Sequence, residues 1–138
     1  MHEWALAEAI VKLIEHRALK DGANRVNRIE IVLGKLQQID EEIFLYAFKE
    51  LLNVLKNEKN IEVVEYRLTR EDPEFKCNRC GLTWSFDTNT VSSDELEMIH
   101  FIPETVHSFI SCPHCGSHDF EITRGRGISI RIIESAEV

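Results

Sequence analysis

The alternation of apolar and polar positions in the first part of the chain predicts a helix followed by a strand. Ala5, Ala9, Leu13 and Ile14 recur at helical spacing from Trp4 to about Lys20, and Asp21-Gly22 supplies a stop. Residues 28–34 then alternate, with three apolar side chains on one face and charged ones opposite, and Gly34 closes the run. This period of two is typical of a half-buried strand.

A second helix and a second strand are predicted next. Asp40 is the predicted N-cap of this second helix, and Glu41 and Glu42 lie in its first turn, where the helix dipole favours anions. The apolar stripe behind them consists of Ile43, Phe44, Ala47, Phe48, Leu51, Leu52 and Leu55. After a polar turn at residues 57–60, residues 61–70 form the second predicted strand.

The composition changes at Glu71-Asp72-Pro73, beyond which cysteines, glycines and short apolar runs replace the longer patterns. Residues 128–132 alternate again, and we expect them to rejoin the first sheet. The predicted fold class is α+β, with two helices packed on a three-stranded sheet and a lobe inserted between strands two and three. The predicted domains are residues 1–72 with 123–138, and residues 73–122.

The length and net charge of the chain limit the classes of function that it can have. A chain of 138 residues with 43% hydrophobic content suits one domain with a small accessory lobe. The formal net charge of −8 argues against a nucleic-acid partner, because phosphate binding requires a cationic face. No window has the apolar length of a membrane span, and an acidic residue follows Met1-His2 where a secretory signal would be basic. We therefore expect a cytoplasmic protein without a membrane partner.

Four cysteines form two Cys-x-x-Cys-Gly motifs, which predict a zinc site made of Cys77, Cys80, Cys112 and Cys115. Four thiolates leave no open coordination position, so the expected zinc ion is structural rather than catalytic. Residues 73–120 have few long apolar runs, and the metal is expected to order a lobe that lacks a core of its own. A rubredoxin-like iron site uses the same ligands and remains an alternative, as does, more weakly, a thiol-disulfide role.

The first three residues suggest a second metal. The terminal amine of Met1, the backbone nitrogen of His2 and its imidazole can close fused chelate rings, a planar nitrogen set that suits Ni(II) or Cu(II). The candidates for a fourth donor are Glu3, His100 and His107, of which His100 keeps the set rich in nitrogen. The alternative is that His2 binds no metal and that the apolar segment around His100 only packs within the protein or contacts a partner.

The chain resembles the HypA/HybF family of hydrogenase maturation proteins along its whole length. The resemblance rests on Met1-His2-Glu3 with residues 6–10 behind it, on Val32-Leu33-Gly34, Phe48-Lys49-Glu50-Leu51 and Gly127-Ile128-Ser129-Ile130, and on both cysteine motifs. It implies a nickel site at His2 with Glu3 beside it in the first domain and a zinc site in the second. It also implies partnership with the nickel-handling maturation GTPase. Some relatives also serve urease.

The predicted function is therefore that of a nickel metallochaperone, which binds Ni(II) at its N-terminus and delivers it to the large subunit of NiFe-hydrogenase during maturation. The predicted nickel ligands are Met1, His2, Glu3 and His100. The alternative is a zinc-ribbon module for protein–protein interaction that has no nickel site. An enzyme is not expected, because no catalytic arrangement has supporting spacing.

Overall fold

The computed structural model describes residues 3–37 and 39–137, and the chain divides into two units. The first unit comprises Met1–Val32, Ile39–Thr69 and Ile128–Val138, and the second comprises Leu33–Gln38 and Arg70–Gly127. The chain therefore passes between the units four times. None of the described helices combines the length and apolar character that a membrane crossing needs.

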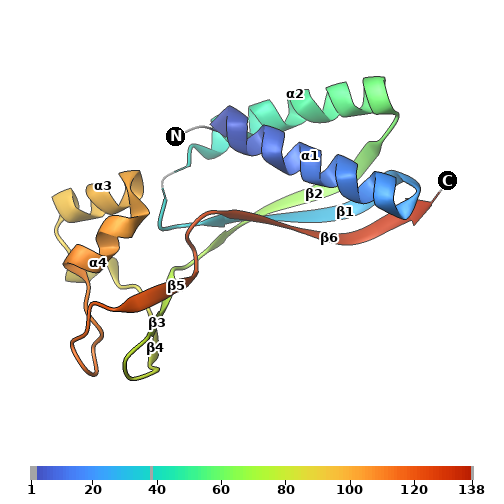
Figure 1. The fold of residues 1–138 in the computed structure, drawn as a ribbon. Coiled ribbons are helices and arrows are strands. Elements are labelled where there is room, and N and C mark those ends of the chain that lie inside the picture. The colour runs from blue at the N-terminus through green and yellow to red at the C-terminus, as the bar shows by residue number, and fades with distance from the viewer. Residues whose placement is uncertain (1–2, 38, 138) are drawn as a thin grey trace. The chain divides into compact units, whose positions relative to one another are not determined.

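The first unit consists of two helices on one face of a three-stranded sheet (Figure 1). Its elements are α1 (Glu3–Asp21), β1 (Ala23–Gly34), α2 (Glu41–Lys59), β2 (Glu62–Glu71) and β6 (Ile128–Glu137), and the strand order is β2-β1-β6. Strands β1 and β2 continue into the second unit by two residues each. The prediction of two helices on three strands, with the third strand after the insertion, is confirmed.

Local sequence explains both ends of α2. The Asp40 carboxylate accepts a hydrogen bond from the Ile43 amide at 3.1 Å, which confirms the predicted N-cap. At the other end Asn60 adopts the left-handed conformation with φ 56° and donates its amide to the Lys56 carbonyl. The helix buries Phe44, Ala47, Phe48 and Leu55, while Ile43 of the predicted stripe is 45% exposed.

Helix α1 is confirmed, but it packs through a different set of side chains from the one that suggested it. Of the four residues at helical spacing, Ile14 is buried, whereas Ala5, Ala9 and Leu13 are exposed. The buried face consists of Glu3, Ala7, Ile10, Val11, Ile14 and Ala18. Two of these residues, Ala7 and Ala18, are alanines, and helical spacing alone did not distinguish them from the exposed alanines Ala5 and Ala9.

Charged side chains connect the three strands of the first sheet. Glu30 lies on the central strand β1 and its carboxylate is 2.6 Å from Nη2 of Arg67 on β2. Its other oxygen is 3.6 Å from Nη1 of Arg131 on β6. The Glu30 side chain is 13% exposed, so these two contacts are better shielded from water than the other ion pairs of this sheet.

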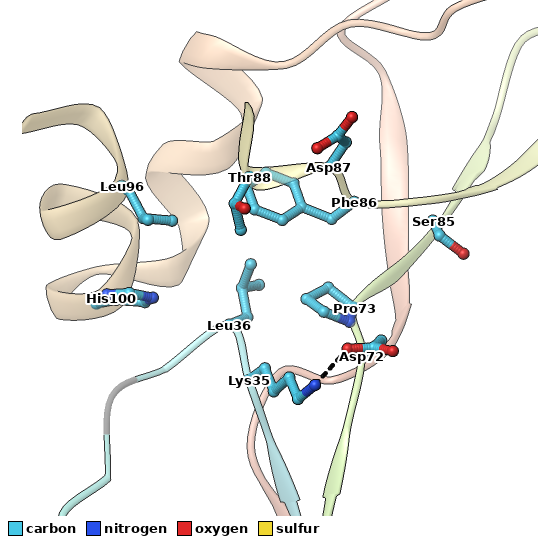
Figure 2. Close-up of a pocket in the computed structure, with 10 residues that line it drawn as sticks. All are labelled: Lys35, Leu36, Asp72, Pro73, Ser85, Phe86, Asp87, Thr88, Leu96 and His100. Atoms are coloured by element: carbon cyan, nitrogen blue, oxygen red, sulfur yellow. Dashed lines mark ion pairs between the residues drawn. The ribbon is translucent and has the colours of Figure 1, made fainter. Parts of the chain in front are cut away.

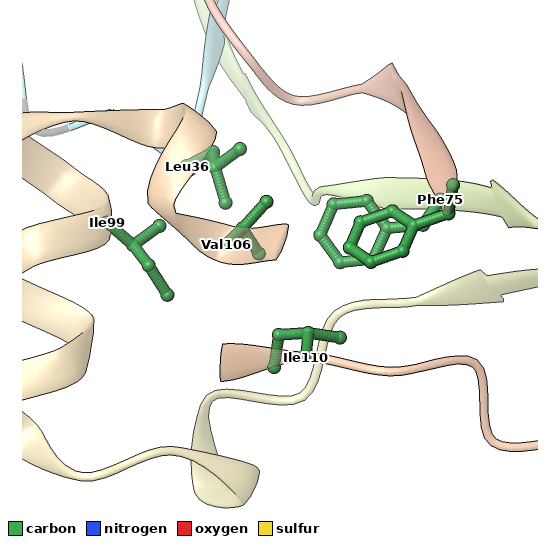
Figure 3. Close-up of a cluster of buried hydrophobic side chains, with 6 residues drawn as sticks. Leu36, Phe75, Ile99, Val106 and Ile110 are labelled. Carbon is green, nitrogen blue, oxygen red and sulfur yellow. The ribbon is translucent and has the colours of Figure 1, made fainter. Parts of the chain in front are cut away.

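The second unit has a sheet and a core of its own. Strands β3 (Glu74–Cys77), β4 (Thr83–Ser85) and β5 (Phe120–Arg124) form an antiparallel sheet in the order β4-β3-β5. The buried cluster comprises Leu36, Phe75, Ile99, Val106, Ile110 and Phe120 (Figure 3). The expectation that this lobe lacks a core was wrong, because single aromatic residues from separate short strands converge: the Phe75 and Phe120 ring centroids are 4.9 Å apart.

The segment between the two cysteine motifs, for which no helix was predicted from the sequence, is largely helical. It contains η1 (Thr88–Thr90), α3 (Ser93–Phe101), η2 (Pro103–Thr105) and α4 (Val106–Phe109). A capping box begins α3: Ser92 Oγ accepts from the Glu95 amide at 3.2 Å, and Glu95 Oε1 accepts from the Ser92 amide at 2.9 Å. The Ser-x-x-Glu pattern was visible in the sequence and could have predicted the helix.

The segment Leu33–Gln38 lies with the second unit, although the predicted domain boundaries placed it in the first. The Lys35 amide donates to the Glu71 carbonyl, and the Leu36 amide donates to the Gly125 carbonyl, each at 2.9 Å. Leu36 is 1% exposed within the buried cluster. Gly34 is required here, because a Cβ at this position would overlap the Gly125 carbonyl. The backbone hydrogen bonds and the burial of Leu36 thus attach this segment to the second unit.

Candidate metal centre

Two matching turns present the four cysteines. Cys77 ends β3 and Cys80 follows in the turn, and the Gly81 amide donates to the Cys77 carbonyl at 3.0 Å. In the second turn the Gly116 amide donates to the Cys112 carbonyl at 2.9 Å. Gly81 and Gly116 have φ values of 80° and 74°, a conformation that side chains other than glycine rarely adopt.

The two turns are fixed against each other by a pair of hydrogen bonds. The Asn78 amide donates to the Asp119 carbonyl at 2.9 Å, and the Asn78 side-chain nitrogen donates to Asp119 Oδ1 at 3.0 Å. Both residues belong to the second unit, and neither contact requires a metal. The protein backbone therefore places the two cysteine pairs side by side.

The sulfur positions fit a tetrahedral zinc ion. The four Sγ atoms of Cys77, Cys80, Cys112 and Cys115 all lie within 4.8 Å of one another. The Cys77–Cys115 and Cys80–Cys112 separations are each 3.6 Å. A tetrahedron with Zn–S bonds of about 2.3 Å has edges of about 3.8 Å, so an ion at the centre needs little rearrangement. Among the side chains that the structure describes, those of residues 3–37 and 39–131, this is the one group of three or more possible metal ligands.

Local electrostatics favour thiolate at some of these positions and thiol at others. The backbone N–H of Cys80, with that of Arg79, lowers the pKa of Cys77 to about 6. Burial raises the pKa of Cys112, but hydrogen bonds from the backbone N–H groups of Cys115 and His114, together with those of the Cys80 and Cys115 thiols, leave it below its ordinary value. At Cys80 the Leu82 amide lowers the pKa, but burial and the other three thiols raise it to about 12. A dication at the centre would favour the thiolate form at all four positions.

His107 and His118 make contacts within the protein that account for their positions without metal ligation. His118 Nδ1 lies 2.9 Å from the Ile110 carbonyl oxygen, a hydrogen bond when that nitrogen carries the proton. The His107 ring centroid lies 4.4 Å from that of Phe120, and its Nδ1 is 3.3 Å from the His118 carbonyl oxygen. His114 is exposed. We infer that His107 and His118 fix the segment that carries Cys112 and Cys115.

The predicted nickel ligands fall in different parts of the chain. Met1 and His2 lie outside the described residues. Glu3 begins α1 in the first unit, where it is 8% exposed and its Oε1 accepts a hydrogen bond from the Asp40 amide at 3.1 Å. His100 lies near the end of α3 in the second unit.

His100 lines a cavity of about 400 Å³ within the second unit (Figure 2). His100 and Leu96 extend from α3 on one side, and Pro73 and Phe86 lie on the other. The walls also carry the Lys35–Asp72 ion pair, whose Nζ and Oδ1 are 2.8 Å apart. The imidazole is half-buried and open to this cavity, so its ring nitrogens are not enclosed by the core.

The chain is similar to known proteins along nearly its whole length. The family model described as hydrogenase/urease nickel incorporation, metallochaperone, hypA matches residues 1–135. A hydrogenase maturation factor HypA from Pyrococcus furiosus is 46% identical over 132 residues, which cover 94% of this chain and 92% of the relative. One from Methanothermobacter thermautotrophicus is 30% identical over 134 residues, covering 97% and 96%.

Solved structures with the same fold agree with the architecture. The solution structure of the Ni metallochaperone HypA from Helicobacter pylori matches with a TM-score of 0.66 at 19% sequence identity, and the match covers 100% of both chains. A second solution structure, of a HypA protein, matches with a TM-score of 0.58 at 21% identity. At these identities the likeness concerns the fold.

Proposed function

Because this chain belongs to the HypA family of metallochaperones for nickel incorporation, we propose that it binds Ni(II) at its N-terminus and delivers the ion to the large subunit of NiFe-hydrogenase. The family consists of metallochaperones rather than enzymes, so nickel is cargo and no reaction is assigned to the chain. The proposed donors are the amine of Met1 and the backbone nitrogen and imidazole of His2, with Glu3 beside them.

The observation that carries this proposal is the anchoring of Glu3. Glu3 is 8% exposed as a residue, and a buried carboxylate without partners would be costly; its Oε1 accepts a hydrogen bond from the Asp40 amide. Asp40 in turn caps α2. Glu3 therefore fixes the start of α1 against the start of α2, and the proposed nitrogen ligands precede it directly along the chain.

The four-cysteine cluster is proposed to hold structural zinc and to take no part in nickel ligation. Zinc would supply a cross-link between the two turns and would neutralise part of the thiolate charge. Its ligands would be Cys77, Cys80, Cys112 and Cys115, whose sulfur geometry fits the ion. His100, by contrast, stays a predicted fourth nickel donor.

Nickel handling requires partners, and we propose two. The first is the nickel-handling maturation GTPase, and the second is the hydrogenase large subunit that receives the ion. The net charge of −8 is compatible with protein partners that present basic surfaces.

Metal analysis of the purified chain tests the nickel site. Wild type, His2→Ala and His16→Ala are incubated with nickel, desalted and analysed for nickel, zinc and iron. His16 is a matched control, because it is an exposed histidine on α1. We expect wild type and His16→Ala to retain nickel, His2→Ala to lose it, and all three to contain zinc.

Three results would contradict parts of the proposal. Nickel retention by His2→Ala would exclude the terminal ligand set. Hydrogenase maturation that survives His2→Ala in a strain lacking the wild-type protein would favour an interaction module without a nickel site. Iron in place of zinc, with the red colour of a ferric tetrathiolate, would favour the rubredoxin-like alternative.

A further inference from the structure

Three large apolar side chains are exposed at the end of α3 and on the residue that follows it. Phe101 is 80% exposed, Met98 is 49% exposed and Ile102, which directly follows the helix, is 46% exposed. Residues three and four apart are neighbours on a helix surface, so Met98 adjoins both of the others. We call these three residues the α3 ridge. Ile99, which points into the core of the second unit, is 0% exposed.

The ridge stands on a helix that is well held at both ends. The capping box of Ser92 and Glu95 fixes its start. At its end the Ile102 amide donates to the Met98 carbonyl at 2.7 Å. Fraying of the last turn therefore does not explain the exposure of Phe101, and burial of Ile99 holds the ridge on the outer side of the helix.

Acidic side chains border the ridge. Asp94 precedes Met98 by four residues and Glu97 precedes Phe101 by four, so each lies one turn away on the same side of the helix. Both are exposed, and neither takes part in an ion pair with another described residue. Glu104 differs, because it pairs with Arg126. The ridge is thus an apolar surface beside uncompensated negative charge.

We propose that the α3 ridge docks into an apolar groove flanked by lysine or arginine on a protein that takes part in nickel delivery. This inference rests on the proposed function, which supplies the class of partner. Exposed apolar patches with a polar border are typical of docking surfaces, and anchors spaced by three and four residues suit a helix in a groove. A second copy of this chain would bring the same acids together, and an anionic membrane would repel them.

Binding measurements with purified partners test the ridge. The maturation GTPase and the hydrogenase large subunit are each titrated with the full-length, zinc-loaded chain. The variants are Phe101→Ser and the pair Asp94→Lys with Glu97→Lys. Leu19→Ser is the control, because Leu19 is 64% exposed on α1. Zinc content and nickel stoichiometry are measured for each protein to show that the variants are folded.

We expect Phe101→Ser to weaken binding to one of the two partners at least about tenfold, as loss of an aromatic anchor does. The double lysine variant should bind more weakly and with a smaller dependence on salt, because attraction to basic groups is lost. Leu19→Ser should bind as wild type does.

Three outcomes overturn the inference. If every variant binds both partners as tightly as wild type, the ridge is not the docking surface, although the proposed function stands. If Phe101→Ser instead turns a dimer into a monomer in sedimentation, the occupant is a second copy. If wild type binds neither purified protein, the ridge proposal and the proposed partnership fail together.

Discussion

Replacement of Leu36 by alanine should destabilise the second unit and leave the first intact. Leu36 is 1% exposed and belongs to the cluster formed with Phe75, Ile99 and Val106. The change removes three carbon atoms, worth roughly 2.4 kcal/mol at about 0.8 kcal/mol per buried methylene. The cavity left behind adds to this, so the expected cost is about 2–5 kcal/mol. In a unit this small, such a loss is a large part of the total stability.

Amide hydrogen exchange measured by mass spectrometry resolves the effect by unit. A loss of about 3 kcal/mol raises the population of the open second unit more than about 100-fold, so protected amides of β3 and β5 should exchange faster by that factor. Amides of α1 and α2 should exchange as in wild type. Leu19→Ala, which truncates an exposed leucine, is the control and should change neither unit. Faster exchange in α2 with unchanged exchange in β3 and β5 would refute the assignment of Leu36 to the second unit.

Three other predictions follow from the site and the turns. Cys112→Ser should release zinc and raise exchange in both cysteine turns, whereas Ser111→Ala should keep the metal; zinc retention by Cys112→Ser would exclude a four-cysteine site. Nickel affinity, measured by calorimetry from pH 8 to about pH 5.5, should fall steeply with pH because the amide and imidazole donors bind only when deprotonated, and a constant affinity would contradict the proposed ligands. Gly34→Ala should lower the melting temperature far more than Gly22→Ala. A Cβ at Gly34 overlaps Gly125, whereas the space at Gly22 is open and an alanine there costs only about 1 kcal/mol for its φ of 65°. Equal shifts in melting temperature would show that the close approach of Gly34 to Gly125 tolerates a side chain.

The elements of the first unit could be predicted because each has a regular local signal. Asp40 and the apolar stripe behind it identify α2, and the alternation around Ile29 and Ile31 identifies β1, whose side chains are 0% exposed at both positions. The buried face of α1 could not be chosen, because alanine occurs on both sides of that helix. Its packing depends on what lies opposite in space.

The second unit was harder to predict for a different reason. Its strands are three to five residues long, and the aromatic residues Phe75, Trp84 and Phe120 meet only when those strands pair. Such a core produces no periodic pattern of apolar residues within any one segment of the sequence. The cysteine ligands, in contrast, follow from spacing alone, because a Cys-x-x-Cys-Gly turn brings its two sulfurs together locally whatever surrounds it.

The strand order β2-β1-β6 has a consequence for synthesis. The central strand β1 is made early, but its second neighbour, β6, leaves the ribosome only after the whole of the second unit has been translated. Both cysteine turns can therefore meet zinc while the sheet of the first unit still lacks an edge strand. The order of translation thus lets the structural metal be taken up before the unit that is proposed to carry nickel is complete.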